Sequence, residues 1–422
     1  MGSRGSLTSA IAALVGALAL ASLTGCEGTV AMDEMPAQPS VAAAAAPTAA
    51  PTPTPTVPPV VTVAPQDGET VALGSEVAVS VANGTLTAVS VSDTEGADLS
   101  GALDPAAHSW TSTGALSPAT HYLVTATAVD SRGLTTERSS SFTTEAPPKV
   151  LTVKIAPLEG ELVGVGMPII VYFSAPVVNK AAVEKALTVD MSQPVPGSWH
   201  WYGTEEVHYR PMEYWPAGEQ VTLHANLQGV DAGNGVWGID NRTLNFTVGD
   251  SHVSTVDATT HLMTVAINGV VARKMDVSTG RDTYPTTSGI HLVLEKSPTV
   301  IMDSATVGIP KGSPDYYYET VDWDVRISWS GEYVHAAPWS LSAQGRQNVS
   351  HGCVNASPAD AKWFYGLSLR GDIVTVTGTP RPLQSGNGWT DWNVSWSDWL
   401  AGSALNGTGT TGTSAAGTGS TA

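Results

Sequence analysis

Apolar and polar residues alternate in short runs along most of the chain. Runs such as "EVAVSV", "YLVTATAV", "PIIVYFS" and "RTLNFTV" are separated by Gly, Pro and Asp. A period of two that is broken by turn residues is typical of antiparallel β-strands packed as small sandwiches. The pattern therefore predicts a mainly β protein.

Two segments of the chain repeat each other. The stretch "APQDGETVALGSEVAV", starting at Ala64, matches "APLEGELVGVGMPIIV", starting at Ala156, at an offset of 92. The later matches "SPATHYLVTA" with "WPAGEQVTLHA" and "FTTE" with "FTVG" have offsets of 98 and 104. We therefore expect two tandem β-sandwich modules, at residues 60–147 and 148–250, the second slightly longer. Their scattered histidines, which suggest packing or surface positions, are His200, His208 and His224.

Residues 251–380 have a different character, with strand-like runs, aromatic loops and one clear helix signal. In "SPADAKWFYGL", Ser357 is suited to cap a helix and Pro358 to be its first residue. The large apolar residues of this helix share one face, which we expect to pack on the sheet. The sequence thus predicts a third, β-rich domain with one main helix.

The two ends of the chain have the composition of processing and spacer segments. An apolar run from Leu7 to Leu23 ends in "LTGC" at Cys26, which is the pattern of a bacterial signal peptide with a lipobox. We expect residues 1–26 to be this signal and Cys26 to be acylated, which places the protein at the outer face of the plasma membrane. An ordinary signal peptide with an incidental cysteine is the alternative. Residues 27–59 read as an Ala/Pro/Thr-rich linker and residues 406–422 as a flexible tail.

Residues 381–405 are rich in tryptophan. In "GWTDWNVSWSDWL" the rings are spaced by three, four and three positions, which predicts a helical stripe made of Trp389, Trp392, Trp396 and Trp399. We expect this segment to pack against the preceding third domain. A surface that stacks on glycans is the alternative.

The chain contains two cysteines, and Cys353 lies in the polar stretch "NVSHGCVNASP". With Cys26 acylated, Cys353 has no disulfide partner and must be a free thiol. A thiol becomes a nucleophile when an imidazole activates it. His351 is too close along an extended strand to meet the sulfur in line, whereas a neighbouring strand can bring His335 across. We therefore expect His335 to be the base, and His351 to shape the loop or contact substrate.

The block "VHAAPWSLSAQGRQNVSHGCVNASPADAKWFYGLSLRGDIV" resembles the catalytic core of the L,D-transpeptidases, which have the YkuD fold. The resemblance rests on a histidine eighteen positions before the cysteine of a Ser-His-Gly-Cys motif. A lipoprotein signal, two immunoglobulin-like modules and this core are similar in arrangement to actinobacterial and mycobacterial members. The resemblance implies that residues 60–400 follow the family architecture, with the catalytic domain at 251–380.

The family pattern also implies roles for individual residues. Cys353 would be the nucleophile and His335 the general base, while the N–H groups of Gly352 and Cys353 and the Tyr317 hydroxyl would stabilise an oxyanion. Ala336 stands where similar mycobacterial sequences have Ser; its backbone carbonyl would serve as the third member of the triad. The residues implied to line the substrate cleft are Met302, Trp339, Ser350, His351 and Asn355.

The activity implied by the resemblance is acyl transfer on peptidoglycan. Cys353 would form a thioester with a tetrapeptide stem, release D-alanine, and pass the acyl group to the side-chain amine of meso-diaminopimelate on a second stem, giving a 3→3 cross-link. No metal or other cofactor is implied, and carbapenems are expected to acylate the same cysteine. An L,D-carboxypeptidase and a non-catalytic wall-binding lipoprotein remain alternatives. The net charge of −19 argues against nucleic acid as a partner.

Overall fold

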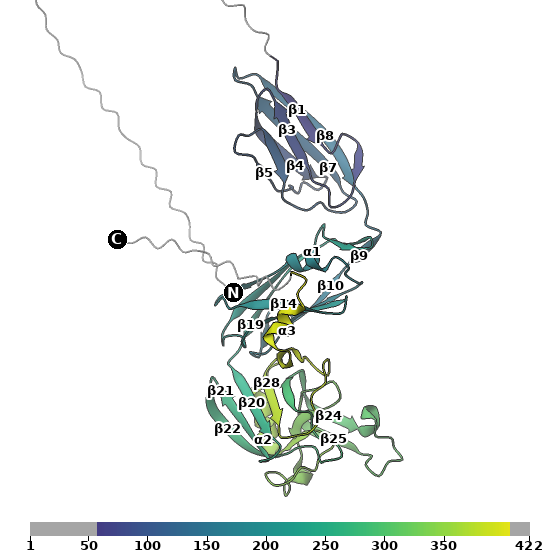
Figure 1. Ribbon diagram of the computed structural model, residues 1–422, viewed down its shortest axis with the longest axis vertical. Coiled ribbons are helices and arrows are strands. Elements are labelled where there is room, and N and C mark those ends of the chain that lie inside the picture. Colours follow the sequence, from purple (N-terminus) through teal and green to yellow (C-terminus); the bar gives the residue numbers. More distant parts are fainter. Residues whose placement is uncertain (1–56, 406–422) are drawn as a thin grey trace, which may run out of the picture. The chain divides into compact units, whose positions relative to one another are not determined.

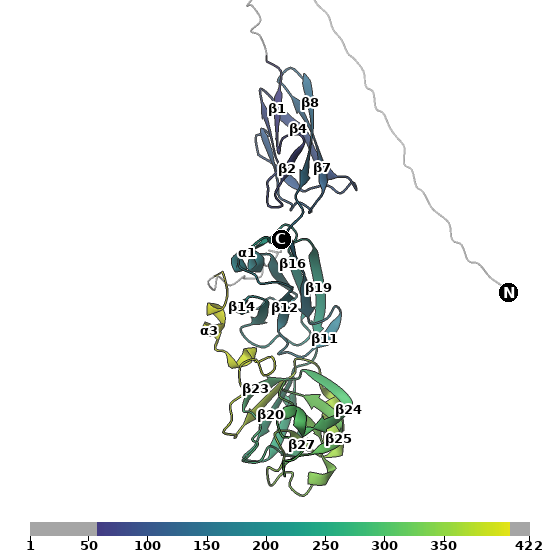
Figure 2. The same ribbon diagram turned by 90° about the vertical axis from the view of Figure 1, so that its right-hand side faces the viewer.

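The computed structural model describes residues 57–405 (Figures 1 and 2). The strands of this part of the chain form five small sheets and one large one, as expected for a mainly β protein. The signal peptide, Cys26, most of the linker and the tail from residue 406 lie outside the described residues. Between residues 57 and 405, no helix has the length and apolar character needed to cross a membrane.

Module 1, residues 60–147, is a sandwich of two four-stranded sheets ordered β1-β3-β6-β5 and β2-β8-β7-β4. The alternation predicted from sequence is plain in β7, where every second side chain, from Tyr122 to Ala128, is buried. These side chains meet those of the facing sheet, including Val79 and Trp110, in one core. The strands are β1 (Val60–Ala64), β2 (Glu69–Val71), β3 (Ala78–Ala82), β4 (Thr85–Asp93), β5 (Gly101–Leu103), β6 (Ser109–Ser112), β7 (His121–Val129) and β8 (Thr135–Thr144).

Module 2, residues 148–250, repeats this plan with sheets ordered β10-β12-β15-β14 and β11-β19-β16-β13, and adds a small sheet β17-β18-β9. Its elements are β9 (Lys149–Leu151), β10 (Val153–Ala156), β11 (Glu161–Val163), β12 (Ile169–Phe173), α1 (Lys180–Lys185), β13 (Leu187–Met191), β14 (Gly197–Tyr202), β15 (Glu206–Pro211), β16 (Gln220–Asn226), β17 (Asp231–Gly233), β18 (Val236–Gly238) and β19 (Asn241–Val248).

The pairing registers confirm the internal repeat. In module 1, β2 runs parallel to β8 with Glu69 opposite Phe142. In module 2, β11 runs parallel to β19 with Glu161 opposite Phe246. These partners differ by the same 92 and 104 positions that the sequence match predicts.

Domain 3 is built on a nine-stranded sheet ordered β23-β28-β20-β21-β22-β27-β26-β25-β24. Helix α2 packs on β25 and β26, and its Phe364 joins the buried core of this domain. The elements are β20 (His252–Asp257), β21 (Leu262–Ile267), β22 (Val270–Ser278), β23 (Gly289–Leu292), β24 (Glu295–Asp303), a 3-10 turn η1 (Ser304–Val307), β25 (Tyr318–Arg326), β26 (Tyr333–Ala336), η2 (Pro338–Ser340), β27 (Val354–Ala356), α2 (Pro358–Leu367) and β28 (Ile373–Thr377).

The start of α2 is the one predicted from sequence. The Ser357 hydroxyl accepts a hydrogen bond from the backbone N–H of Asp360, and Pro358 is the first helical residue. Because β27 ends one residue before this cap, a short strand and a capped helix hold the loop that carries Cys353. The sequence pattern thus locates the rigid elements around the thiol correctly.

The tryptophan-rich segment differs from the prediction in shape, and it packs on module 2 as well as on domain 3. It forms two short pieces, η3 (Asp391–Asn393) and α3 (Trp396–Ala401), rather than one helix. The reason is Ser395, whose hydroxyl caps a new helix by accepting from the N–H of Asp398. The turn η3 contacts β23 of domain 3, where the Asn393 side chain accepts from the N–H and donates to the carbonyl of Ile290. Helix α3, in contrast, packs on β14 of module 2 (Figure 1).

Side chains of module 2 explain this position. The Arg210 guanidinium lies over three rings, at 4.6 Å from Trp392, 5.2 Å from Trp396 and 4.6 Å from Trp399. The ring of Trp399 is fully buried, and its Nε1 donates to the carbonyl of Ser198. A surface that stacks on glycans needs solvent-exposed ring faces, whereas these rings pack on other protein side chains.

Two of the three scattered module 2 histidines also pack against this C-terminal segment. His200 stacks on Trp399 with ring centroids 4.7 Å apart. His208 is buried between Glu206 and Asp391, at 2.7 and 2.9 Å. Packing roles for these two residues agree with the expectation from sequence.

Candidate active site

Cys353 lies at the end of a tight loop directly before β27. Gly352 has a φ of 129°, a backbone conformation that residues other than glycine rarely adopt. The Ser350 hydroxyl donates to the carbonyl of Cys353 at 2.6 Å and accepts from the N–H of Gly352 at 3.1 Å. The side chain of Ser350 therefore stabilises the loop by two hydrogen bonds to the backbone of the same motif.

This loop geometry affects one expected role. The N–H of Gly352, which we expected to stabilise an oxyanion, is already used in the bond to Ser350. Gly352 is also not among the residues that line the cavity in front of Cys353. Gly352 thus serves the conformation of the loop in this structure, and it is not placed as an oxyanion donor.

The Cys353 thiol is almost completely buried, with 8% of the residue exposed. Its Sγ is 3.7 Å from the carbonyl oxygen of Gly331, to which it donates. Burial raises the pKa of the thiol to about 12; the backbone N–H of Tyr333 opposes the rise, and nearby carboxylates, first that of Glu332, add to it. The resting cysteine is therefore a neutral thiol.

His335 lies on the strand beside the one that follows Cys353, and both residues line the same cavity. Strand β26 pairs in parallel with β27, and Val334 lies opposite Val354. The Nδ1 atom of His335 is 3.0 Å from the carbonyl oxygen of Ala336. A carbonyl can only accept, so Nδ1 carries the proton and Nε2 keeps a free lone pair. Burial lowers the pKa of His335 to about 4, which keeps the imidazole neutral.

The contact with Ala336 shows why an alanine is sufficient at this position. The group that orients the imidazole is the backbone carbonyl, and every residue type provides one. A serine hydroxyl is not needed for this hydrogen bond. The departure from the family pattern at Ala336 therefore leaves the orientation of His335 intact.

Cys353 and His335 open into a cavity of about 240 Å³. All the residues expected to line a substrate cleft are found here, namely Met302, Trp339, Ser350, His351 and Asn355, together with the expected oxyanion donor Tyr317. Two further lining residues, Glu319 and Val349, were not expected from the sequence. Glu319 follows Tyr317 by two positions, and the period of an extended strand would have placed both on one face.

Aromatic contacts hold the wall of this cavity. The ring of Tyr317 lies 4.8 Å from that of His351, and the ring of Trp339 lies 6.1 Å from that of His335. Burial raises the pKa of Tyr317 to about 12, with the charges of Cys353 and Glu319 adding to the effect. Its phenol therefore stays protonated and can donate a hydrogen bond.

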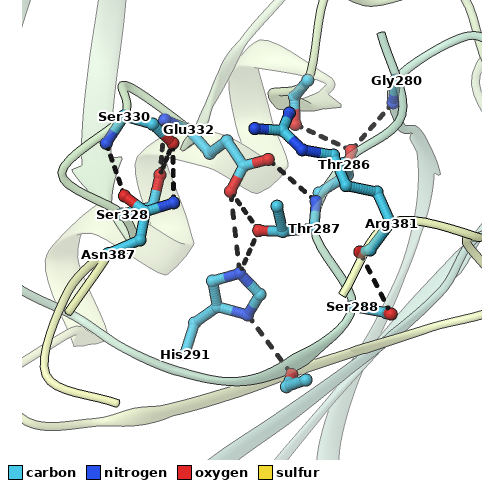
Figure 3. A network of polar contacts seen from close by, with 12 residues as sticks. Gly280, Thr286, Thr287, Ser288, His291, Ser328, Ser330, Glu332, Arg381 and Asn387 are labelled. Carbon is cyan, nitrogen blue, oxygen red and sulfur yellow. Dashed lines mark hydrogen bonds and ion pairs between the residues drawn. The ribbon is translucent and has the colours of Figure 1, made fainter. Parts of the chain in front are cut away.

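A polar network around Thr286, Thr287 and Glu332 joins segments that are distant in the sequence (Figure 3). The Thr286 hydroxyl accepts from the N–H of Gly280 at 2.9 Å and donates to the carbonyl of Gly352 at 2.7 Å. The next residue, Thr287, donates through its N–H and its hydroxyl to Glu332, which follows Gly331. One short segment thus ties the loop that carries Cys353 to the loop that contacts its thiol.

Glu332 is the buried charged member of this network. His291 contacts both Thr287, at 2.8 Å, and Glu332 (Figure 3). Burial raises the pKa of Glu332, but the hydrogen bonds from His291 and Thr287 outweigh it and hold the pKa below its ordinary value. Glu332 is therefore ionised and fully hydrogen-bonded, which makes it a rigid anchor.

Comparison with known proteins agrees with this arrangement. Residues 251–376 match the family model described as L,D-transpeptidase catalytic domain, and residues 52–231 match that of a bacterial Ig domain. The chain is 40% identical over 348 residues to L,D-transpeptidase 2 of Mycobacterium tuberculosis, covering 82% of this chain and 85% of the relative. It is 35% identical over 338 residues to L,D-transpeptidase 5 of the same organism, covering 78% and 73%.

A solved structure is also similar to part of the chain. L,D-transpeptidase 3 of Mycobacterium tuberculosis, in complex with a faropenem-derived adduct, is 37% identical and superposes with a TM-score of 0.45, over 54% of this chain and 98% of the other. The sequence relationships, which extend over most of both chains, are sufficient to assign the family. The chain belongs to the L,D-transpeptidases, with an immunoglobulin-like region followed by a YkuD catalytic domain.

Proposed function

We propose that this L,D-transpeptidase forms 3→3 cross-links between peptidoglycan stem peptides through a thioester on Cys353. The supporting observation is that Cys353 and His335 line one cavity while the Ala336 carbonyl fixes the free lone pair of His335 on Nε2. This lone pair is the proton acceptor that a neutral thiol requires. The donor is a tetrapeptide stem that ends in D-alanine.

In the first half of the reaction, His335 Nε2 takes the proton of Cys353 as Sγ bonds to the carbonyl carbon between the third residue and D-alanine. The oxyanion that forms accepts a hydrogen bond from the protonated hydroxyl of Tyr317, together with the N–H of Cys353. The C–N bond then breaks, and the imidazolium returns its proton to the amine of D-alanine. The product is a thioester and free D-alanine.

In the second half, the side-chain amine of the third residue of another stem, meso-diaminopimelate in the proposed substrate, attacks the thioester carbon. His335 accepts a proton from the attacking nitrogen and returns it to the Cys353 sulfur as the C–S bond breaks. The result is one new amide bond and the original neutral pair. No metal or organic cofactor takes part in these steps.

The test is mass spectrometry of the products from a purified disaccharide-tetrapeptide, with Cys353→Ala in parallel. We expect D-alanine and a dimer with a 3→3 link from the wild-type protein, and neither from the variant. If tripeptide forms without dimer, the protein is an L,D-carboxypeptidase and not a transpeptidase. An unchanged substrate would refute the proposed activity altogether.

We also propose that the protein is exported and lipid-anchored at Cys26 on the outer face of the plasma membrane, within reach of the wall. The support is the lipobox "LTGC" and the linker that follows it. Metabolic labelling with a fatty acid tests this directly. Label that persists in Cys26→Ala would contradict the assignment.

Carbapenems are proposed as covalent inhibitors, because a strained β-lactam carbonyl can replace the peptide carbonyl in the first half of the reaction. The thioester would again form on Cys353. Intact-protein mass spectrometry should show one added carbapenem on the wild-type chain and none on Cys353→Ala. Modification of the variant would place the reaction elsewhere.

A further inference from the structure

Glu319 places a carboxylate at the edge of the active-site cavity. It lies on β25 opposite Met302 of β24, and both residues line the cavity together with Cys353. Of the ten lining residues, Glu319 is the one that carries a carboxylate, and none of them is Lys or Arg. The cavity therefore has a single acidic side chain and no permanent positive charge of its own.

No ion pair found within residues 57–405 involves Glu319. Glu319 is exposed to solvent, yet the protein around it removes enough water to raise its pKa. A carboxylate that is partly desolvated and has no cationic partner is well placed to bind a cation from outside the chain.

The charge of Glu319 also acts against the proposed chemistry. It raises the pKa of the Tyr317 phenol and of the Cys353 thiol, and so opposes both a thiolate and an oxyanion beside it. A positive group bound next to Glu319 would cancel this effect. The reaction is therefore favoured when a cationic part of the substrate occupies this edge of the cavity.

We propose that Glu319 binds the primary ammonium group of a stem peptide. The inference rests on the proposed function, in which the third residue of each stem carries a side-chain amine. Such an amine has an ordinary pKa of about 10.4 and is an ammonium ion at neutral pH. The ammonium can belong to the donor stem or to the acceptor stem, and the chemistry that Glu319 recognises is the same in both.

The experiment compares the wild-type protein with Glu319→Gln and with Asp322→Asn as matched control. Asp322 lies on the same strand, is exposed, accepts a hydrogen bond from Thr299 and does not line the cavity. Both substitutions remove one negative charge and keep the shape of the side chain. A difference between them therefore reports the position of the charge and not the net charge of the protein.

Two assays separate the sources of the ammonium. For the donor, D-alanine release is measured from a disaccharide-tetrapeptide with a free side-chain amine and from the same compound with that amine acetylated. For the acceptor, dimer formation is measured at increasing concentrations of a tripeptide stem, which has no D-alanine to lose. Since one partly exposed ion pair is broken, we expect a change of about three- to tenfold.

A donor ammonium predicts that Glu319→Gln lowers kcat/KM for the free-amine donor and not for the acetylated one. An acceptor ammonium predicts a higher half-saturating tripeptide concentration in Glu319→Gln. Either result supports the inference, provided that Asp322→Asn behaves as the wild type. Values within twofold of the wild type in both assays would overturn it.

The proposed function is tested first and separately, by D-alanine release that Cys353→Ala abolishes. If the wild-type protein releases no D-alanine, the proposed function fails, and the inference about Glu319 fails with it. If release is normal and Glu319→Gln matches the wild type, the inference about Glu319 fails alone. Equal melting temperatures of the three proteins show that the comparison concerns binding and not folding.

Discussion

Asp324 carries a carboxyl group that the fold buries without compensation. Its side chain is fully covered on β25, and within the described residues neither oxygen accepts a hydrogen bond of good geometry. Burial raises the pKa of Asp324 from 3.8 to about 7; the charge of Asp322 adds to the rise, and the backbone N–H of Val300 offsets only a part. The folded chain therefore keeps a proton on Asp324 that the unfolded chain loses.

This difference sets the sign and size of a pH effect on stability. The pKa of Asp324 is higher in the folded than in the unfolded chain. Its contribution to stability is therefore greatest below about pH 4 and is lost as the pH rises to about 7. A difference of roughly three pKa units, at 1.36 kcal/mol each, amounts to about 4 kcal/mol at pH 8. At pH 5 only about one unit separates the pH from the unfolded pKa, and the loss is roughly 2 kcal/mol.

Asp324→Asn keeps the shape of the side chain and removes its ionisation. The free energy of unfolding of the variant minus that of the wild type measures the gain in stability. We expect this gain to be about 2 to 3 kcal/mol larger at pH 8 than at pH 5. Urea denaturation followed by tryptophan fluorescence at the two pH values measures this difference. Asp282→Asn is the control, because Asp282 is exposed in the same domain.

Two results would refute the reasoning. A stability difference between Asp324→Asn and wild type that is equal at pH 5 and pH 8 would show that Asp324 ionises normally in the folded chain. A gain of similar size in Asp282→Asn would assign the effect to the net charge of −19 rather than to burial.

Four further outcomes are expected. Thr286→Val should lower the rate of D-alanine release about tenfold, since it leaves the Gly352 carbonyl without its hydrogen bond, and Thr286→Ser should restore it. The rate of thioester formation should fall only as the pH drops toward 4, because protonation of His335 removes the base; a midpoint near 6.5 would contradict its burial. Ala336→Ser should change D-alanine release by less than about twofold, because the orienting group is the carbonyl. Arg210→Ala should expose the C-terminal segment to limited proteolysis, since it removes three cation–π contacts of about 0.5 to 2 kcal/mol each.

The sequence predicts most of the fold because its signals are local. Alternation defines the strands, and the two copies share turn residues at fixed offsets, so the parallel pairing of β2 with β8 recurs as β11 with β19. The capped start of α2 depends on Ser357 and Pro358 alone. A pattern confined to a few neighbouring residues predicts local structure without knowledge of the contacts that those residues make with the rest of the chain.

The packing of the tryptophan-rich segment on module 2 was not predicted, because these partners are distant in sequence. The spacing of Trp396 and Trp399 does correspond to a helix, but Ser395 restricts that helix to a single short turn region. Its anchors, Arg210 and Glu184, precede it by about two hundred positions, and Glu184 binds Ser403 through a buried hydrogen bond. No local pattern indicates that such a segment will cover module 2 in addition to domain 3.

The sequence can point to Cys353 and His335 as a candidate catalytic pair, but not to the residues that support them. Cys353 and His335 stand out because a lone thiol and a nearby imidazole have little other use in a polar loop. Thr286, Thr287 and Glu332 are ordinary residues, and the hydrogen bonds that connect them to this site span 45 to 66 positions. Only the folded sheet brings them together, and the sequence gives no reason to choose them.

The electrostatics of the site determine when the thiol becomes reactive. Burial favours the neutral form of both Cys353 and His335, and three carboxylates, those of Glu332, Asp324 and Glu319, further disfavour a thiolate. A proton moves from sulfur to imidazole only if the resulting charges are stabilised at once, by the carbonyl carbon that Sγ attacks and by the donors that meet its oxygen. Bound substrate supplies the first condition, and under our inference its ammonium group also neutralises Glu319. Under the proposed mechanism, substrate binding therefore generates the thiolate of Cys353, and the free protein does not hold a thiolate that other reagents could attack.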